Sequence, residues 1–245
     1  MTPHESRAPR LYVPEPLSTG VEIALEHAQS HYLTRVMRLN AGDPVRIFNE
    51  RDGEWLAQLA SARKGVAVRT ERHVADVQPP PDIDLVFAPI KQLRLDYAVQ
   101  KATELGVRRL RPVITERTIV RRVNSDRLRA NAIEAAEQCN LVFLPEIAEP
   151  RSLEAMLGEW DPARRAVYCD ETAPVGDPVA ALGKLRLPVA VFVGPEGGFT
   201  SGERAMLRSL PFVTPISLGP RIIRADTAAV AALALIQAVA GDWHS

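Results

Sequence analysis

The chain has 245 residues, 46% of them hydrophobic, and is therefore long enough to form one large domain or two small ones around a real core. Its 30 Lys and Arg balance its 30 Asp and Glu, so the net charge excludes a strongly basic or acidic protein and favours no class of partner. The two cysteines belong to no Cys/His cluster, which excludes a disulfide scaffold and argues against a structural zinc site.

The amino-terminal part of the chain is predicted to be β-rich. Residues 1–16 carry no apolar signal-peptide core. β-type runs separated by Gly, Asp and Asn occur at 11–16, 43–62 and 65–74. Arg51–Glu54 is predicted to be a hairpin turn, and one helix is expected at 26–39. Several short strands at this spacing predict a small β-barrel domain at 1–76.

Residues 77–84 (VQPPPDID) are predicted to form a linker, because three consecutive prolines fit neither a helix nor a central strand. A second domain is expected at 82–245, where β-type and α-type segments alternate. Strands are predicted at 83–90, 110–115, 165–170, 189–194 and 212–219, and helices at 92–105, 125–140, 202–210 and 226–241. This alternation predicts an α/β fold, with a largely parallel sheet and helices on both faces.

Local signals mark the ends of some of these helices. Gly106 is placed to end the first helix of the second domain. Thr200 and Glu203 have the spacing of a capping box. The last helix is the longest apolar stretch but is too short to span a bilayer, so we expect a cytoplasmic protein without a membrane partner.

Charge is distributed unevenly along this neutral chain. Residues 91–129 contain eleven Lys and Arg against four Asp and Glu, whereas residues 130–200 contain five against eleven. A localised basic segment predicts an anionic partner. For any single side chain in it, a solvated helix face is the alternative.

Two strand-to-helix junctions have the composition of a ligand site. The first is GPEGGF at 194–199, and the second is LGPRIIR at 218–224. Both follow predicted strands, so we expect both loops at the carboxyl edge of the sheet, where open α/β sheets hold ligands. A pocket made mostly of backbone groups suits a flat heterocycle such as adenine, with a plain tight turn as the alternative. The sequence contains neither a dinucleotide-binding GxGxxG motif after a strand nor a P-loop.

The residues around both junctions resemble a known family. VGPEGGFTSGE (193–203) and LGPRIIRADTAAVAAL (218–233) resemble the SPOUT superfamily of knotted methyltransferases, and within it the RsmE-type family. HYLTRVMRLNAGDPVRIFN (31–49), KQLRLDYAVQKATELGVRRLRPVITERT (91–118) and AIEAAEQC (132–139) are similar to further segments of that family, in the same order. The resemblance therefore covers both expected domains.

The resemblance implies an amino-terminal PUA-like β-barrel that helps to hold RNA. It also implies a carboxyl-terminal SPOUT α/β domain whose last segment passes through a loop as a trefoil knot. Members of the family act as homodimers, use S-adenosylmethionine and methylate N3 of a uridine in 16S ribosomal RNA, so naked RNA or the small ribosomal subunit is the implied partner, without a metal. Asp226 departs from the pattern, because the family usually has Glu before the Thr-Ala of the last helix.

The resemblance also implies which residues hold the cofactor. The glycines would let the backbone approach it closely. Leu218, Gly219 and Ile223 would enclose adenine, with ordinary core packing as the alternative for Leu218 and Ile223. The implied cofactor-binding residues are Val193, Gly194, Pro195, Gly197, Gly198, Leu218, Gly219, Ile223, Arg224 and Thr227.

Methylation of uridine N3 requires the loss of a proton, so a general base or a cation that stabilises the uridine anion is expected nearby. Arg224 is the predicted cation, with a structural ion pair to Asp226 as its alternative. Asp226, Glu196 and Glu104 are the base candidates, and the sequence does not choose among them. For Glu196 the alternative is a carboxylate that merely stabilises the turn.

Basic side chains in both domains are candidates for contacts with RNA phosphates, and for each of them a merely solvated charge is the alternative. They are Arg7, Arg10, Arg35, Arg38, Lys91, Arg94, Lys101, Arg117 and Arg121. Two other functions compete with N3 methylation. One is a ribose 2′-O-methyltransferase of the same fold, and the other is a non-catalytic RNA-binding or ribosome-assembly factor.

Overall fold

The computed structural model describes residues 3–62, 65–174 and 176–243. The chain divides into two compact units. The first contains residues 1–79 together with 136–144, and the second contains residues 80–135 and 145–245. The first unit therefore recruits a short segment from the middle of the chain in addition to its amino-terminal part.

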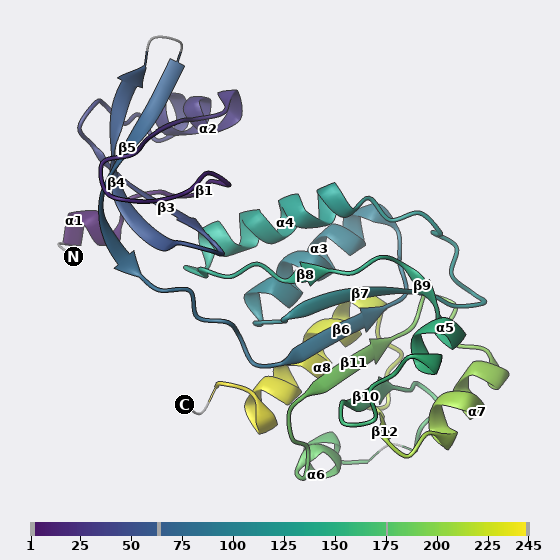
Figure 1. Ribbon diagram of the computed structural model, residues 1–245. Helices are drawn as coiled ribbons and strands as arrows, with labels where there is room; N and C mark the ends of the chain where they lie inside the picture. The colour runs from purple at the N-terminus through teal and green to yellow at the C-terminus, as the bar shows by residue number, and fades with distance from the viewer. Residues whose placement is uncertain (1–2, 63–64, 175, 244–245) are drawn as a thin grey trace. The chain divides into compact units, whose positions relative to one another are not determined.

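The first unit is built on a five-stranded sheet with the order β1-β3-β4-β5-β2 (Figure 1). Its elements are α1 (Pro3–Ser6), β1 (Arg10–Tyr12), β2 (Glu22–Ala24), α2 (His27–His31), the π-helical turn η1 (Tyr32–Val36), β3 (Pro44–Asn49), β4 (Gly53–Ala62) and β5 (Gly65–Ala75). β1 pairs with β3 in parallel, and the other pairs are antiparallel. Residues that alternate along these strands, among them Val45, Ile47 and Val68, form the core.

The predicted hairpin between β3 and β4 is confirmed. Asn49 pairs with Gly53, and Gly53 has a φ of 76°, which glycine adopts without steric cost. The predicted helix at 26–39 differs in part, because α2 passes into η1 and the chain then turns at Arg38, whose φ is 56°. The hydroxyl of Thr34 donates to the Ser30 carbonyl, a type of bond that distorts regular helices.

A buried carboxylate joins the sheet of the first unit to the segment 136–144. Glu54 is 2% exposed and accepts from Arg10 Nε at 2.6 Å and from Arg46 Nη2 at 2.7 Å. Arg10 also donates to the carbonyls of Ala136 and Leu141. The guanidinium of Arg10 thus satisfies carbonyls at the end of a helix, where cations are favoured.

The second unit contains a parallel sheet with the order β12-β10-β11-β6-β7-β8, and β9 pairs with β7 (Figure 1). Its elements are β6 (Ile83–Phe87), α3 (Gln92–Glu104), β7 (Arg109–Ile114), α4 (Ser125–Gln138, whose end belongs to the first unit), β8 (Glu146–Ile147), β9 (Arg151–Ser152), α5 (Leu153–Gly158), β10 (Arg165–Cys169), α6 (Pro178–Leu182), β11 (Val189–Val193), α7 (Ser201–Ser209), β12 (Val213–Ile216) and α8 (Ala225–Ala240).

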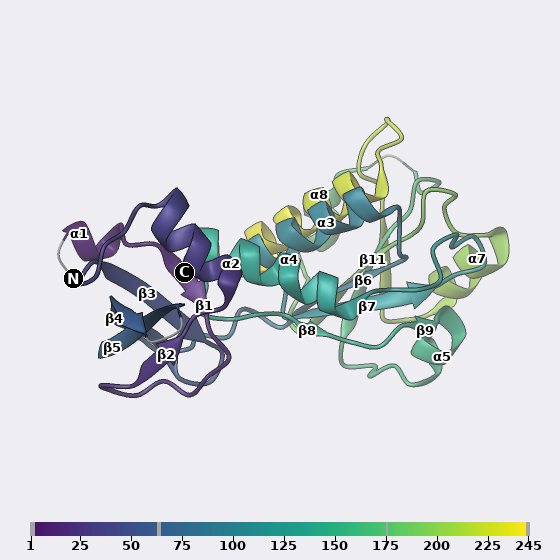
Figure 2. The same ribbon diagram turned by 90° about the horizontal axis from the view of Figure 1, so that it is seen from above.

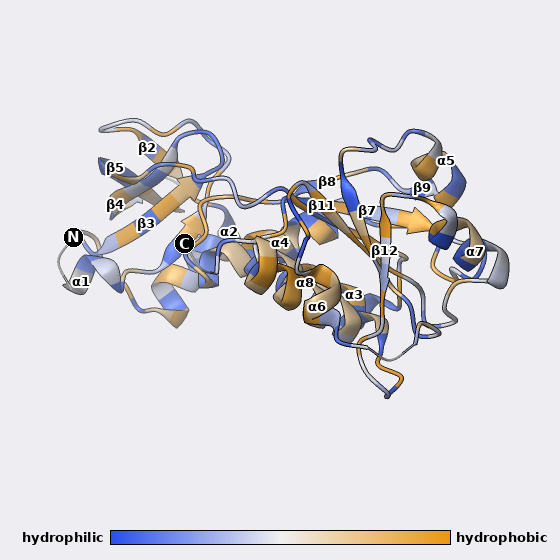
Figure 3. Ribbon diagram, turned by 90° about the horizontal axis from the view of Figure 1, so that it is seen from below, coloured by the Kyte–Doolittle hydropathy of each residue, from blue (hydrophilic) through white to orange (hydrophobic). Residues whose placement is uncertain are grey.

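The sheet of the second unit is covered on both faces, as predicted. Val189, Val191 and Val193 of β11 pack with α3, α4, α6 and α8, whereas Ala190 and Phe192 pack with α5 and α7. Figure 2 shows α3, α4 and α8 gathered together, away from α5 and α7. Figure 3 shows the hydrophobic character of α8, which contributes residues such as Leu233 and Ile236 to the core. None of the described helices is long and apolar enough to cross a membrane.

Some elements of the second unit were not predicted from the sequence. The helices α5 and α6 are short, and only their caps, Ser152 and Asp177, carry a helix signal. The predicted strand at 212–219 is shorter, because β12 ends at Ile216 and Ser217 then forms a tight turn by accepting from the Gly219 amide at 3.3 Å. Gly106 ends α3 with a φ of 69°, as predicted.

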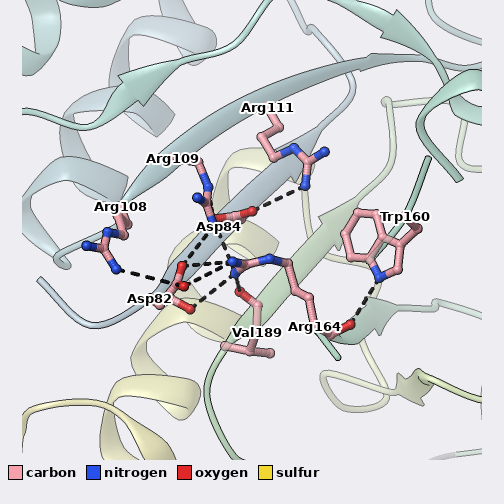
Figure 4. Close-up of polar contacts among 8 residues, drawn as sticks. All are labelled: Asp82, Asp84, Arg108, Arg109, Arg111, Trp160, Arg164 and Val189. Atoms are coloured by element: carbon pink, nitrogen blue, oxygen red, sulfur yellow. Dashed lines mark hydrogen bonds and ion pairs between the residues drawn. The ribbon is translucent and has the colours of Figure 1, made fainter. Parts of the chain in front are cut away.

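A cluster of ion pairs lies at the amino edge of the same sheet (Figure 4). Asp84 is fully buried and accepts from Arg109 Nε at 2.8 Å and from Arg111 Nη1 at 3.3 Å. Asp82 accepts from Arg109 at 2.8 Å and from Arg164 at 3.0 Å. Asp84 on β6 and Asp82, which directly precedes β6, thus link the beginnings of β7 and β10. Four arginines therefore form structural ion pairs with Asp82 or Asp84, namely Arg108, Arg109, Arg111 and Arg164.

Candidate functional site

Three loops meet at the carboxyl edge of the sheet. β11 ends at Val193 and β12 ends at Ile216, and both run parallel to β10, which lies between them. The prediction that the loops 194–199 and 218–224 share one edge is therefore confirmed. The loop that follows β10 at Cys169 separates them and was not predicted to belong to the site. Its signal in the sequence is weak, because only Asp170 and Glu171 after a short apolar run distinguish it.

The loop after β11 is held in a tight conformation that depends on its glycines. Gly198 has a φ of 65°, and its amide donates to the Pro195 carbonyl at 2.9 Å. A Cβ at Gly198 would lie 2.6 Å from Glu171 Oε1, and one at Gly194 would lie 2.8 Å from the Phe199 ring. Phe199 is itself 1% exposed and packs edge-on against Tyr168 at 5.2 Å, so it anchors the loop to the core.

The loop after β12 presents both apolar and backbone groups. Leu218 and Ile223 are half-buried and pack against the hydrophobic core with part of their surface open. Gly219 has a φ of 102°, a conformation that favours glycine. Ile222, by contrast, is 93% exposed and points away from the core.

The first turn of α8 carries the predicted catalytic residues Arg224 and Asp226. Arg224 is the exposed N-cap residue, and Asp226 Oδ1 accepts from the Thr227 amide at 3.1 Å. Among the residues that the structure describes, no ion pair joins Arg224 to Asp226 or to any other carboxylate. The guanidinium of Arg224 is therefore available to a ligand.

The other two base candidates lie on different elements. Glu196 is exposed on the loop after β11, which is separated from the start of α8 by the β10 loop. Glu104 ends α3, which begins near the carboxyl edge and runs back toward the start of β7, and it pairs with Lys101 at 2.7 Å. The structure therefore does not bring Glu104 to the candidate site.

Burial and hydrogen bonds adjust the ionisation of the β10 loop. Burial alone would raise the pKa of the Asp170 carboxyl, but hydrogen bonds from Thr172 and Arg208 outweigh it and hold the pKa below its usual value. Burial raises the pKa of the Cys169 thiol to about 12, so the thiol stays protonated at neutral pH. Within the described residues, no group of three His, Cys, Asp or Glu side chains is arranged to hold a metal ion.

The predicted RNA-binding residues fall into several environments. Arg10 is 7% exposed and fully engaged with Glu54 and the segment 136–144, so its guanidinium is not available to a phosphate. Arg117 is exposed, but its Nη1 donates to the Gly197 carbonyl at 2.9 Å, a contact that the sequence did not reveal. Lys101 pairs with Glu104. The remaining ones make no ion pair within the described part of the chain, namely Arg7, Arg35 and Arg38 in the first unit and Lys91, Arg94 and Arg121 in the second.

Comparisons with known proteins match both units of the chain. A family profile described as an RNA methyltransferase domain matches residues 78–237. A second profile, described as an RNA methyltransferase PUA domain, matches residues 25–71.

Alignments with similar proteins cover almost the whole chain. A ribosomal RNA small subunit methyltransferase E of Rickettsia conorii is 33% identical over 93% of this chain and 94% of its own length. A protein of the same name from Synechocystis is 34% identical over 89% of this chain and 73% of its own length. The crystal structure of a ribosomal RNA small subunit methyltransferase E from Neisseria gonorrhoeae, bound to S-adenosylmethionine, has a TM-score of 0.82 at 29% identity. It covers 97% of this chain and all of its own chain.

Proposed function

Since the chain belongs to the RNA methyltransferase family, we propose that it transfers a methyl group from S-adenosylmethionine to N3 of a uridine in 16S ribosomal RNA. One observation carries this proposal. The two glycine-containing loops meet at one carboxyl edge of a parallel sheet, in a chain similar along its whole length to an S-adenosylmethionine-bound rRNA methyltransferase.

The residues at this edge fit the cofactor. Gly198 and Gly219 have φ values of 65° and 102°, which bring backbone groups to a surface without a side chain. Leu218 and Ile223 keep part of their apolar surface open, as a heterocycle requires. We propose that the cofactor is held by Val193, Gly194, Pro195, Gly197, Gly198, Leu218, Gly219, Ile223, Arg224 and Thr227. When bound, S-adenosylmethionine supplies an electrophilic methyl group.

The chain's own residues would then orient and activate the uridine. The guanidinium of Arg224, which makes no ion pair with the residues that the structure describes, would provide two parallel donors for a base carbonyl or a phosphate and would stabilise negative charge that develops on the base. Asp226, in the first turn of the same helix, and Glu196, on the loop after β11, are the candidates to accept the N3 proton. Since Glu104 lies elsewhere, two base candidates remain.

We propose that residues 1–76 form a PUA-like RNA-holding domain and that residues 82–245 form the methyltransferase domain. The profile matches at 25–71 and 78–237 support this division. Several basic side chains make no ion pair within the described part of the chain and are available to phosphates, namely Arg7, Arg35 and Arg38 in the first domain and Lys91, Arg94 and Arg121 in the second; all are exposed except Arg94, which is half-buried. Because the proposed substrate is ribosomal, we also propose that the protein acts in the cytoplasm. The trefoil knot that the family resemblance implies stays a prediction.

A transfer assay tests the proposal. The purified protein is titrated with S-adenosylmethionine and then incubated with labelled cofactor and small ribosomal subunits or 16S RNA that lack the modification. The proposal predicts binding of the cofactor and transfer of the label to RNA, with transfer weakened by salt at subsaturating RNA. Cofactor binding without transfer to either substrate would favour a non-catalytic factor, and no cofactor binding would contradict the proposed site.

A further inference from the structure

We propose that Glu203 is a positioning residue for the cofactor site. Its side chain holds the glycine-rich loop 194–199 against the turn that follows β7. The inference rests on the proposed function, because it concerns how the loop 194–199 is kept in the form that accepts the cofactor. Glu203 lies in the first turn of α7 and is only 4% exposed. A carboxylate buried to this degree requires partners for both of its oxygens.

The two carboxylate oxygens of Glu203 bind different segments of the chain. Oε2 accepts from the Thr200 amide at 2.8 Å, and the Thr200 hydroxyl accepts from the Glu203 amide at 3.3 Å, which completes the predicted capping box. Oε1 accepts from the Glu116 amide at 2.9 Å, a residue that is 87 positions away in the sequence. A helix cap needs only the first of these bonds. The second bond ties α7 to the end of β7.

The partner turn is well fixed. The Thr115 amide donates to Thr118 Oγ1 at 2.9 Å, and the two threonine hydroxyls lie 2.8 Å apart. The Thr118 amide closes the turn by donating to the Thr115 carbonyl at 3.1 Å. Thr115 and Thr118 are 3% and 4% exposed. The hydrogen bonds of this turn therefore fix the direction in which the Glu116 amide points toward Glu203.

A second contact joins the same two segments. Arg117 Nη1 donates to the Gly197 carbonyl at 2.9 Å, inside the glycine-rich loop. A Cβ at Gly197 would lie 3.5 Å from Arg117 Cβ, so the arginine stem packs directly along the loop. Because β6 lies between β11 and β7, both contacts reach across the carboxyl end of β6. Arg117 thus holds the glycine-rich loop at Gly197, and Glu203 holds its end at Thr200.

The substitution Glu203→Gln separates the two bonds. A carboxamide has one acceptor oxygen, so its NH₂ group must face either the Thr200 or the Glu116 amide, both of which are donors. We expect the helix cap to be kept and the bond to Glu116 to be lost. Hydrogen exchange of the Glu116 amide in the cofactor-free protein should then accelerate, and the Kd for S-adenosylmethionine, measured by calorimetry, should rise about tenfold.

Two further variants make the test specific. Arg117→Ala removes an exposed side chain and leaves Glu203 intact, so it should fold normally and raise the Kd about threefold. Asp161→Asn makes the same carboxylate-to-carboxamide change at a residue that accepts from the Ala163 amide before β10, far from the loops, and its Kd should equal that of the wild type. Thermal unfolding without cofactor shows that each variant is folded at the temperature of the titration.

The outcomes separate the inference from the proposed function. If Glu203→Gln and Arg117→Ala bind S-adenosylmethionine with wild-type affinity, the positioning role is overturned, even if Glu203→Gln unfolds at a lower temperature as a lost helix contact would dictate. Since the carboxamide can keep only one of the two bonds, unchanged exchange of both the Glu116 and the Thr200 amides overturns the assignment of these bonds to Glu203. If the wild-type protein binds no S-adenosylmethionine, the proposed function fails, whereas the exchange measurement still tests the contact between the two segments.

Discussion

Gly198 occupies a backbone conformation and a space that no other residue tolerates well. Its φ is 65°, and a Cβ would lie 2.6 Å from Glu171 Oε1. A β-branched side chain is strained at positive φ, with a cost of about 1–3 kcal/mol. The loop after β11 therefore depends on glycine at this position for its shape.

Gly198→Val is expected to weaken S-adenosylmethionine binding at least about tenfold, because the loop must leave its conformation or Glu171 must move. Calorimetric titration measures the effect. Gly202→Ala is the matched control, since Gly202 lies within α7 and the nearest atom to its Cβ would be Thr200 Oγ1 at 4.0 Å. Equal affinity of the wild type and Gly198→Val would contradict the proposal that the cofactor binds at this loop.

The guanidinium of Arg224 has no carboxylate partner in the described part of the chain, in contrast to those of Arg204 and Arg208 in the same unit. Arg224→Ala is expected to lower the single-turnover rate of methylation about 100-fold, because a preorganised donor to the developing anion is lost. Arg221→Ala removes another exposed guanidinium from the same loop and should retain most of the rate. A rate for Arg224→Ala close to that of Arg221→Ala would show that Arg224 is not the cation.

Among the elements, the alternating pattern of the second domain was predictable and several contacts between elements were not. The strands β6, β10 and β11 are buried apolar runs between helical segments, and this local pattern implies a parallel sheet. The bond from Glu116 to Glu203 joins residues far apart in the sequence and leaves no local signal. The same is true of Arg10, whose burial against the segment 136–144 depends on tertiary structure.

The site was also predictable only where the sequence carries a local signal. Glycines and prolines after apolar strands marked two loops of the carboxyl edge, since these residues have local conformational consequences. The β10 loop carries no such marker, and only the strand order shows that it lies between them. Charged residues were the least predictable, because Arg117 and Arg10 are distinguished from solvated arginines only by their tertiary partners.

The ion-pair cluster at the amino edge predicts a stability effect at the scale of the sheet. Asp84 is fully buried and faces Arg109, Arg111 and Arg164 (Figure 4). Asp84→Asn leaves these guanidiniums without their buried counter-charge, so we expect the free energy of unfolding to fall by about 3–5 kcal/mol. Urea denaturation at neutral pH measures the change.

An exposed ion pair provides the control for this prediction. Arg151 and Glu159 have side chains that are 49% and 70% exposed, and solvent screens their attraction. Glu159→Gln should therefore change the free energy of unfolding by no more than about 1 kcal/mol. If Asp84→Asn is as mild as Glu159→Gln, the cluster does not stabilise the sheet.

At the scale of the whole molecule, we propose a homodimer, as the family resemblance implies. The second unit exposes large apolar side chains near the start of α3, with Leu93 83% and Tyr97 45% exposed, and Ile222 is 93% exposed on the loop before α8. Exposed apolar groups of this size are typical of interfaces. Light scattering at micromolar concentration should give about twice the chain mass of 26.9 kDa, and the mass of a single chain would contradict the proposal.

Methylation of N3 of a uridine in small-subunit ribosomal RNA is tested most directly by the identity of the modified nucleoside. Small subunits or 16S RNA from a strain that lacks the enzyme are incubated with the protein and S-adenosylmethionine, digested to nucleosides and separated with mass detection. We predict N3-methyluridine that forms only in the presence of the protein and is strongly reduced with Arg224→Ala. A 2′-O-methylated nucleoside, or no new methylated nucleoside under conditions where the cofactor binds, would contradict it.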